Sequence, residues 1–174
     1  ALPILLLQMM SRGLLSQPLL SVSPWFEQRR PDYQDRLLEV STRGDWEGWL
    51  LFFCQGIEES CEDALLRVKR LNNLRDRYRR LVADHRYGAT TMNAAMTFIG
   101  QPYTTAPILS RAVGKSYTAT RGALANLESL GIVKAVKGGS SIGYMAEDVM
   151  LAVSAAAGHA VEPDAPLLSE TRGD

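Results

Sequence analysis

The sequence contains few of the residues that build disulfide frameworks and metal centres. Among 174 residues there are two cysteines and two histidines. Cys54 and Cys61 fall in a segment with a helical pattern, where a separation of seven residues is too long for a disulfide. They are therefore interpreted as reduced core residues of a cytoplasmic protein. The two histidines have no clustered ligand partners, so the pattern does not favour a structural zinc site.

The sequence also lacks a net charge. Nineteen lysines and arginines balance nineteen aspartates and glutamates, and the pI is near 7.0. The whole molecule therefore has no general field that attracts nucleic acid, and any such binding needs a local basic patch. An apolar fraction of 46% is sufficient for substantial hydrophobic cores.

Long apolar runs are absent as well. The most apolar segment, residues 1–10 (ALPILLLQMM), is too short to span a bilayer and has no cationic start of the kind that signal peptides carry. It predicts a buried helix, and we expect no membrane partner. A chain that opens inside such a helix is expected to continue a longer protein.

The most informative stretch is 104–148, which begins with two helical patterns. Apolar residues recur at helical spacing up to Gly114, which breaks the first helix. Ser116 is placed to cap a second helix whose apolar side extends to Leu130. Together with a helix expected at 92–99, this predicts three short helices with a tight turn between the last two.

A β-hairpin pattern follows these helices. Gly131 ends the second helix, and residues 132–136 alternate as a strand before a Gly-rich turn and a second short strand at 144–146. Two helices followed by a hairpin predict a winged helix-turn-helix, a fold whose second helix can enter the major groove of DNA. A short closing helix is expected at 148–157.

Upstream of this stretch the sequence predicts helices throughout. Pro24 and Pro31 suit the first turns of two helices, and Asp45 is placed to cap a third after a loop at 41–44. The helix after Pro31 is expected to bury Tyr33, Leu37, Leu38 and Val40. The start of the third helix predicts a crowded core surface made of Trp46, Trp49, Leu50, Phe52 and Phe53.

The helical pattern continues over 57–85 as one long helix. Its acidic start and basic end complement the helix dipole, and the charges are interpreted as a solvated face. The expected buried seam consists of Ile57, Cys61, Ala64, Val68, Leu71, Tyr78, Val82 and His85.

Residues 13–60 closely resemble the part of Fic-family proteins that lies just after the catalytic loop. The resemblance is carried by Gly13-Leu14-Leu15, Pro18-Leu19-Leu20, Ser23, Phe26, Arg30, Tyr33, Leu37, Val40 and, above all, Gly44-Asp45-Trp46 with Trp49, Phe52 and Phe53. In many Fic proteins this part is followed by a long helix and a winged helix.

Fic proteins typically transfer AMP from ATP to a hydroxyl side chain of a target protein. Their signature, HPFxDGNGRxGR, supplies a general base, an acidic metal ligand and a phosphate-binding turn. The sequence does not contain it, and residues 1–7 resemble the helix that follows it. The resemblance thus implies the C-terminal segment of an adenylyltransferase, inactive alone, with no catalytic, cofactor-binding or metal residue. ATP and Mg²⁺ are expected only for the parent Fic domain.

The resemblance and the patterns together imply a mainly α-helical chain in four parts. Residues 1–56 are expected to be the C-terminal helices of a Fic domain, and 57–87 a long linking helix. Residues 88–158 are expected to form the winged-helix domain with its small β-hairpin, and 159–174 a flexible tail.

Two functions remain open for the winged helix. One is binding of double-stranded DNA, with bases and phosphates contacted by Lys115, Ser116, Tyr117, Thr118, Arg121 and Lys137. The other is dimerisation, or docking of a target protein of the parent enzyme, without DNA binding. Five basic residues against three acidic ones give residues 88–157 a net charge of +2, a weakly basic module.

Overall fold

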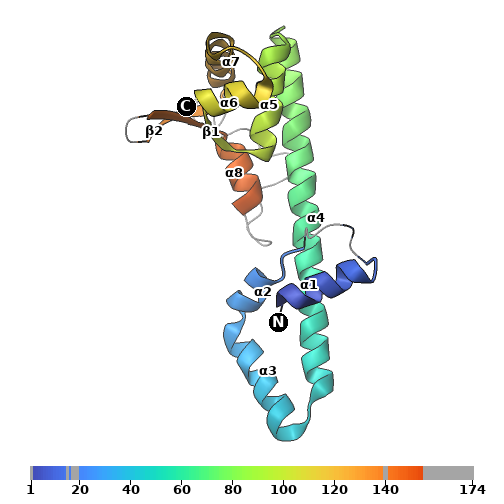
Figure 1. Ribbon diagram of the computed structural model, residues 1–174. Helices are drawn as coiled ribbons and strands as arrows, with labels where there is room; N and C mark the ends of the chain where they lie inside the picture. The colour runs from blue at the N-terminus through green and yellow to red at the C-terminus, as the bar shows by residue number, and fades with distance from the viewer. Residues whose placement is uncertain (1, 15, 17–19, 139–140, 155–174) are drawn as a thin grey trace, which may run out of the picture. The chain divides into compact units, whose positions relative to one another are not determined.

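The computed structural model describes residues 2–14, 16, 20–138 and 141–154 (Figure 1). The chain is mainly helical, with one small antiparallel sheet, and divides into two compact units, residues 1–66 and 67–174. The long helix α4 (Trp46–Asp84) contributes residues to both units. No helix in the described part of the chain combines the length and apolarity that crossing a bilayer requires.

The described residues of the first unit form four helical segments. These are α1 (Leu2–Ser11), α2 (Ser23–Gln28), α3 (Arg30–Arg43) and the first part of α4. A proline lies in the first turn of both α2 and α3, as the sequence predicts. The predicted helix over residues 1–10 is confirmed as α1, but its predicted burial is wrong at Leu7, which is 64% exposed.

The loop predicted at 41–44 is wrong, because α3 continues to Arg43. The hydroxyls of Ser41 and Thr42 donate to the carbonyls one turn earlier, at 2.9 and 2.8 Å, instead of competing with the helix. Gly44 then ends α3 in a left-handed conformation (φ 70°) that glycine adopts without strain. The cap predicted at Asp45 is confirmed, since its Oδ1 accepts the Gly48 N–H at 3.0 Å.

Aromatic side chains from α2, α3 and α4 form the core of the first unit. Trp25 and Phe26 are buried, and the Phe26 ring lies 5.7 Å from Tyr33 and 5.6 Å from Phe53 between centroids. Trp49 contacts Tyr33 at 5.3 Å. The Phe26–Tyr33 and Tyr33–Trp49 pairs pack edge to face, an arrangement that contributes beyond the apolar area it buries.

Several residues predicted for this core are exposed instead. They lie on the outer sides of α3 and α4. The apolar stripe on each of these helices is broad, and a small unit cannot bury the full width of such a stripe. Cys61 packs beside the aromatic cluster, but Cys54 is exposed, so its assignment to the core is wrong; both thiols are free. The residues that were predicted for the core of the first unit but are exposed are Leu37, Leu38, Trp46 and Leu50.

Gly56 allows α4 to approach α2 closely. A Cβ at this buried position would lie 2.8 Å from Trp25 Cε3 and 2.9 Å from Phe26 Cζ. Both rings are held by the aromatic cluster, so neither can move aside freely.

We predict that Gly56→Val lowers the free energy of unfolding by about 2 kcal/mol, because overpacking a filled core costs about 1–3 kcal/mol. Gly122→Val is the matched control, since a Cβ at that helical glycine meets nothing within 4 Å. Urea unfolding of the two variants measures the difference, and equal stabilities would contradict the close packing of α2 on α4.

In the second unit, the described residues up to 154 combine the end of α4 with four further helices and three strands. They are α5 (Ala89–Gly100), β1 (Tyr103–Thr105), α6 (Ala106–Val113), α7 (Tyr117–Ser129), β2 (Lys134–Gly138), β3 (Ser141–Met145) and α8 (Glu147–Ser154). The strand order is β1-β3-β2, antiparallel throughout. Figure 1 shows the β2–β3 hairpin projecting from the helices of this unit.

One hydrophobic core joins these elements. Its largest fully buried side chains come from every helix of the unit and from the segment that leaves α7: Tyr78, Phe98, Leu109, Leu124, Leu127, Ile132, Val82 and Val149. Tyr78 and Val82 confirm the end of the predicted seam on α4. The predicted burial of Val68 is wrong, because this side chain lies about a quarter turn from the buried face of α4. The predicted burial of His85 is also wrong, because α4 ends at Asp84 and His85 is exposed.

The predicted helices of this unit are confirmed, and the strands are shifted. Residues 132–136 were expected as a strand, but Ile132 and Val133 remain packed on α7, with their N–H groups donating to the Leu127 carbonyl at 3.0 and 3.4 Å. The ladder therefore starts at Lys134. The strand β1 is too short to show a pattern in sequence. The tail expected at 159–174 and the last residues of the helix expected at 148–157 lie outside the described residues.

Candidate nucleic-acid interface

The turn before α7 is fixed by two local interactions. Gly114 ends α6 in the left-handed conformation (φ 62°), and the Ser116 side chain accepts the Ala119 N–H at 3.3 Å. Both the break at Gly114 and the cap at Ser116 are confirmed predictions. They place the first turn of α7 at a defined angle to α6.

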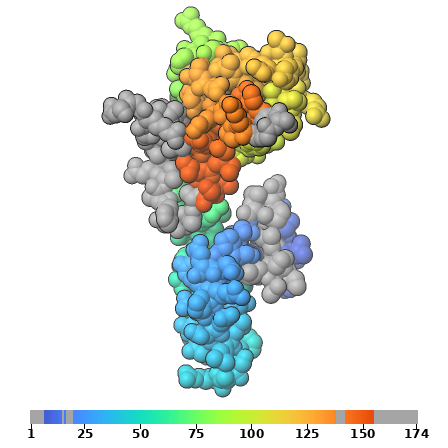
Figure 2. Space-filling model, turned by 90° about the vertical axis from the view of Figure 1, so that its left-hand side faces the viewer, coloured from blue at the N-terminus to red at the C-terminus, as the bar shows by residue number. Residues whose placement is uncertain are grey.

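The helix α7 has one buried and one exposed face. Thr120, Ala123, Leu124 and Leu127 are buried, and the Thr120 hydroxyl donates to the Ser116 carbonyl at 3.0 Å. The opposite face carries the predicted contact residues and two small positions, and Figure 2 shows this part of the chain (orange) at the surface. The exposed residues on this side of α7 include Tyr117, Thr118, Arg121, Gly122, Ala125, Glu128 and Ser129.

The hairpin register places Lys137 on a defined face of the sheet. Lys137 is opposite Ile142, and Ala135 is opposite Tyr144. Because side chains alternate along a strand, Lys137 lies on the same face as Tyr144, whereas Lys134 lies on the other. Lys137 and Ile142 are both exposed near the end of the hairpin.

Tyr117 and Tyr144 both affect the pKa of Arg121. The hydrogen bond with Tyr117 and the nearby phenols of Tyr117 and Tyr144 raise the pKa of Arg121 above its usual range. The influence of Tyr144 on Arg121 could not be read from the sequence, because it depends on how β3 and α7 fold within the same unit.

The cations of this unit differ in whether they have partners. Lys134 Nζ lies 3.4 Å from Glu147 Oε1, and Arg111 Nε donates to the Pro107 carbonyl at 3.5 Å. Over residues 88–138 and 141–154, by contrast, Lys115, Arg121 and Lys137 form no ion pair with a carboxylate. Cations of this kind can contact phosphates or base edges.

The structure therefore brings most of the six predicted residues to one part of the unit. Lys115, Ser116, Tyr117, Thr118 and Arg121 follow one another at the start of α7, and all are exposed. Lys137 comes from the hairpin. Sequence reasoning missed Ile142, an exposed apolar side chain at the hairpin end, and the small positions Gly122 and Ala125. Helical periodicity alone would have identified the last two as outward-facing.

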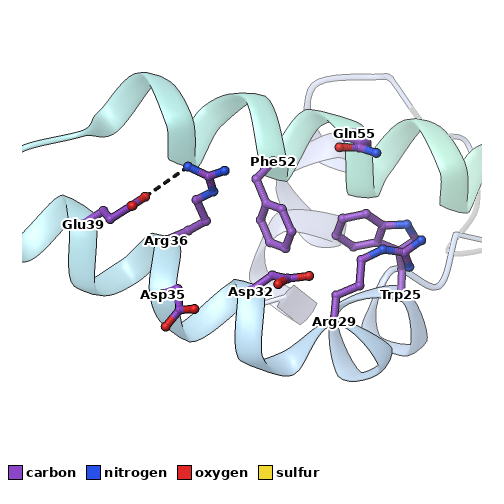
Figure 3. Close-up of a pocket in the computed structure, with 8 residues that line it drawn as sticks. All are labelled: Trp25, Arg29, Asp32, Asp35, Arg36, Glu39, Phe52 and Gln55. Atoms are coloured by element: carbon purple, nitrogen blue, oxygen red, sulfur yellow. Dashed lines mark hydrogen bonds and ion pairs between the residues drawn. The ribbon is translucent and has the colours of Figure 1, made fainter.

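The first unit contains a second candidate, a pocket of about 400 Å³ between α2, α3 and α4 (Figure 3). Its walls mix acidic, basic and aromatic side chains: Trp25, Arg29, Asp32, Asp35, Arg36, Glu39, Phe52 and Gln55. Much of this charge is satisfied internally, since Arg36 donates to Glu39 Oε2 at 3.0 Å. Arg29 stacks on the Trp25 ring at 4.2 Å from its centroid. The described residues contain no group of three His, Cys, Asp or Glu side chains that could hold a metal ion.

The comparisons with known proteins do not assign the chain. No protein-family model matches the sequence, and no curated protein matches it.

Glu59 of α4 is the acceptor for a network beside this pocket. Its Oε2 accepts Trp25 Nε1–H at 2.6 Å and Arg29 Nη2–H at 3.1 Å, and its Oε1 accepts Gln55 Nε2–H at 2.8 Å. The Trp25 and Gln55 hydrogen bonds and the Arg29 charge lower the pKa of Glu59, against a smaller opposing effect of burial. The ionised carboxylate therefore stabilises the contact of α2 with α4.

Because the pKa of Glu59 is depressed in the folded state, this stabilisation is present above the ordinary glutamate pKa of 4.5 and is lost as pH falls through the folded-state value. We predict that Glu59→Gln destabilises the fold by about 1 kcal/mol at pH 7, discounted for partial exposure. The variant should also lose less stability than the parent as the pH is lowered further into the acid range.

Thermal unfolding over a series of pH values from pH 7 into the acid range measures both effects. Glu58→Gln is the control, because the neighbouring Glu58 is exposed and lies outside the hydrogen-bond network of Glu59. An identical pH dependence in the Glu59→Gln variant and the parent would show that the network does not stabilise the charged form.

Proposed function

We propose that residues 88–154 form a winged helix-turn-helix that binds double-stranded DNA, with α7 in the major groove and the β2–β3 hairpin against the adjacent backbone. The observation that carries the proposal is that the start of α7 and the end of the β2–β3 hairpin each carry exposed cations that have no carboxylate partner among the described residues. Lys115 and Arg121 lie at the exposed start of α7, and Lys137 lies near the end of the hairpin. An α-helix fits the major groove, and cations on the flanking hairpin reach phosphates.

The exposed face of α7 also suits close approach to base edges. Gly122 and Ala125 are small, and a Cβ at Gly122 would meet nothing within 4 Å. Thr118 and Arg121 flank these positions and carry the groups that contact thymine methyls and guanine. The buried face of the same helix is fully used by the core, so α7 presents one surface for a ligand.

The net charge of +2 over residues 88–157 determines how strongly DNA binding should depend on salt. With about two phosphates neutralised, by Lys115 and Lys137, the slope of log K against log salt should be about −2. Affinity should therefore be measurable at low ionic strength and fall only moderately with added salt.

We predict that the full chain binds duplex DNA in a fluorescence anisotropy assay at low salt, and that Arg121→Ala and Lys137→Ala each weaken binding about tenfold. Lys134→Ala is the matched control. It removes the same charge from the same strand, but on the opposite face and from a side chain already paired with Glu147.

Two results would contradict the proposal. One is no duplex binding by the parent chain at low salt. The other is binding that Lys134→Ala weakens as much as Arg121→Ala and Lys137→Ala do, since this would indicate general charge attraction without a defined surface.

We further propose that the first unit belongs to the C-terminal segment of a Fic-type AMP-transferring protein. The support is the resemblance over residues 13–60 together with the packing of its most specific markers. Phe26, Tyr33, Trp49 and Phe53, which carry that resemblance, contact one another in a single aromatic cluster. Their arrangement supplies a scaffold, and the residues for phosphate binding and general base catalysis belong to the parent protein.

We predict that the chain transfers no AMP when it is incubated with labelled ATP and Mg²⁺, because it lacks the HPFxDGNGRxGR signature. Autoradiography of the chain and of a mixed protein extract measures transfer. Labelled protein that appears only when this chain is present, and that keeps its label after denaturation, would contradict the proposal that the chain is a non-catalytic scaffold.

A further inference from the structure

The two arginines that line the pocket of the first unit both have a carboxylate partner. Arg29 Nη2 lies 3.1 Å from Glu59 Oε2, and its guanidinium stacks on the Trp25 ring at 4.2 Å from the centroid. Arg36 Nη1 lies 3.0 Å from Glu39 Oε2. Because each arginine is already paired, neither supplies an uncompensated positive charge to an anionic ligand.

The two aspartates of the same pocket are not paired in this way. Asp32 and Asp35 lie about one turn apart on α3, and neither forms an ion pair with a cation in the part of the chain that the structure describes. Figure 3 shows the Asp32 carboxylate turned toward the aromatic side chains of the pocket, whereas Asp35 is directed away from α4. Asp32 therefore supplies negative charge inside the pocket, and Asp35 adds to the negative potential at its edge.

Aromatic rings form the apolar part of the pocket. The Phe52 ring of α4 lies 5.0 Å from the Trp25 ring between centroids, and Phe26 lies 5.0 Å from the other neighbour of this contact, Trp25. Trp25 is also fixed by its Nε1–H, which donates to Glu59 Oε2 at 2.6 Å. These rings are held by the protein itself, so a ligand that packs on them immobilises little further. The electron density of an aromatic face also attracts cations.

We propose that this pocket binds an organic cation in which one ammonium group is joined to an apolar body. The ammonium group pairs with the Asp32 carboxylate, and the apolar body packs on Phe52 and Trp25. The volume of about 400 Å³ lies within the range of small-molecule sites. Both aspartates repel an anion, and a neutral apolar molecule would desolvate Asp32 without supplying a partner. This site lies in the first unit and is independent of DNA binding by the second.

The test uses the full ¹⁵N-labelled chain and three probes that share a phenyl ring and a short alkyl chain. They are phenethylammonium, which is cationic, phenethyl alcohol, which is neutral, and hydrocinnamate, which is anionic. We expect saturable chemical shift changes of the Trp25 indole N–H and of the amides around Asp32 with phenethylammonium. Binding of the other two probes should be at least about tenfold weaker.

Asp32→Asn should weaken the binding of phenethylammonium about tenfold, because it removes the charge and keeps the size of the side chain. Asp32 is exposed at the start of α3, so the core stays intact, and circular dichroism confirms that the variant is folded. Added salt should weaken binding to the parent and have little effect on the variant. Glu58→Gln is the matched control, since it removes one negative charge from an exposed position of α4 that does not line the pocket.

Three results would overturn the inference. The first is the absence of saturable shifts with phenethylammonium. The second is equally tight binding of phenethyl alcohol or hydrocinnamate, since the pocket would then not select a cation. The third is an affinity for phenethylammonium that Asp32→Asn leaves unchanged, or that Glu58→Gln lowers by as much, because the carboxylate in the pocket would then have no specific role.

Discussion

The burial of one face of α7 determines most of what the second unit can do. Leu124 and Leu127 are inaccessible in the core formed with α5, α6 and the end of α4, and Ala123 is nearly so. Because successive residues turn by about 100° around a helix, fixing this face fixes the opposite one. A rotation that exposed these leucines would cost several kcal/mol of apolar burial, far more than any single surface contact could return. The outward direction of Arg121 is therefore a consequence of the core.

The sheet extends this constraint to the hairpin. Three strands in antiparallel register connect β1, next to α6, with the β2–β3 hairpin, and a one-residue slip would move Lys137 to the opposite face. Gly143 helps to hold the register, because a Cβ there would meet the Tyr103 ring on the neighbouring strand. Core packing thus fixes which side of α7 carries Arg121, and strand register fixes which face of the hairpin carries Lys137.

The sequence predicts the local parts of this arrangement well and the non-local parts poorly. Gly114, Ser116 and Asp45 act on residues within one helical turn, so their roles follow from local rules of helix capping. By contrast, the exposure of Trp46 depends on which side of α4 meets α3, and the strand β1 exists only because β3 lies beside it. The apolar pattern identifies helices but does not specify which of several apolar faces finds a partner.

The central claim is that the exposed start of α7 and the hairpin together contact duplex DNA. Its most direct measurement is a titration of the ¹⁵N-labelled full chain with a DNA duplex, followed by amide chemical shifts. The account predicts progressive shifts over residues 115–122 and at 137 and 142, with little change over α5 and over the first unit. Shifts confined to α8 or to the first unit, with the amides of α7 unaffected, would contradict it.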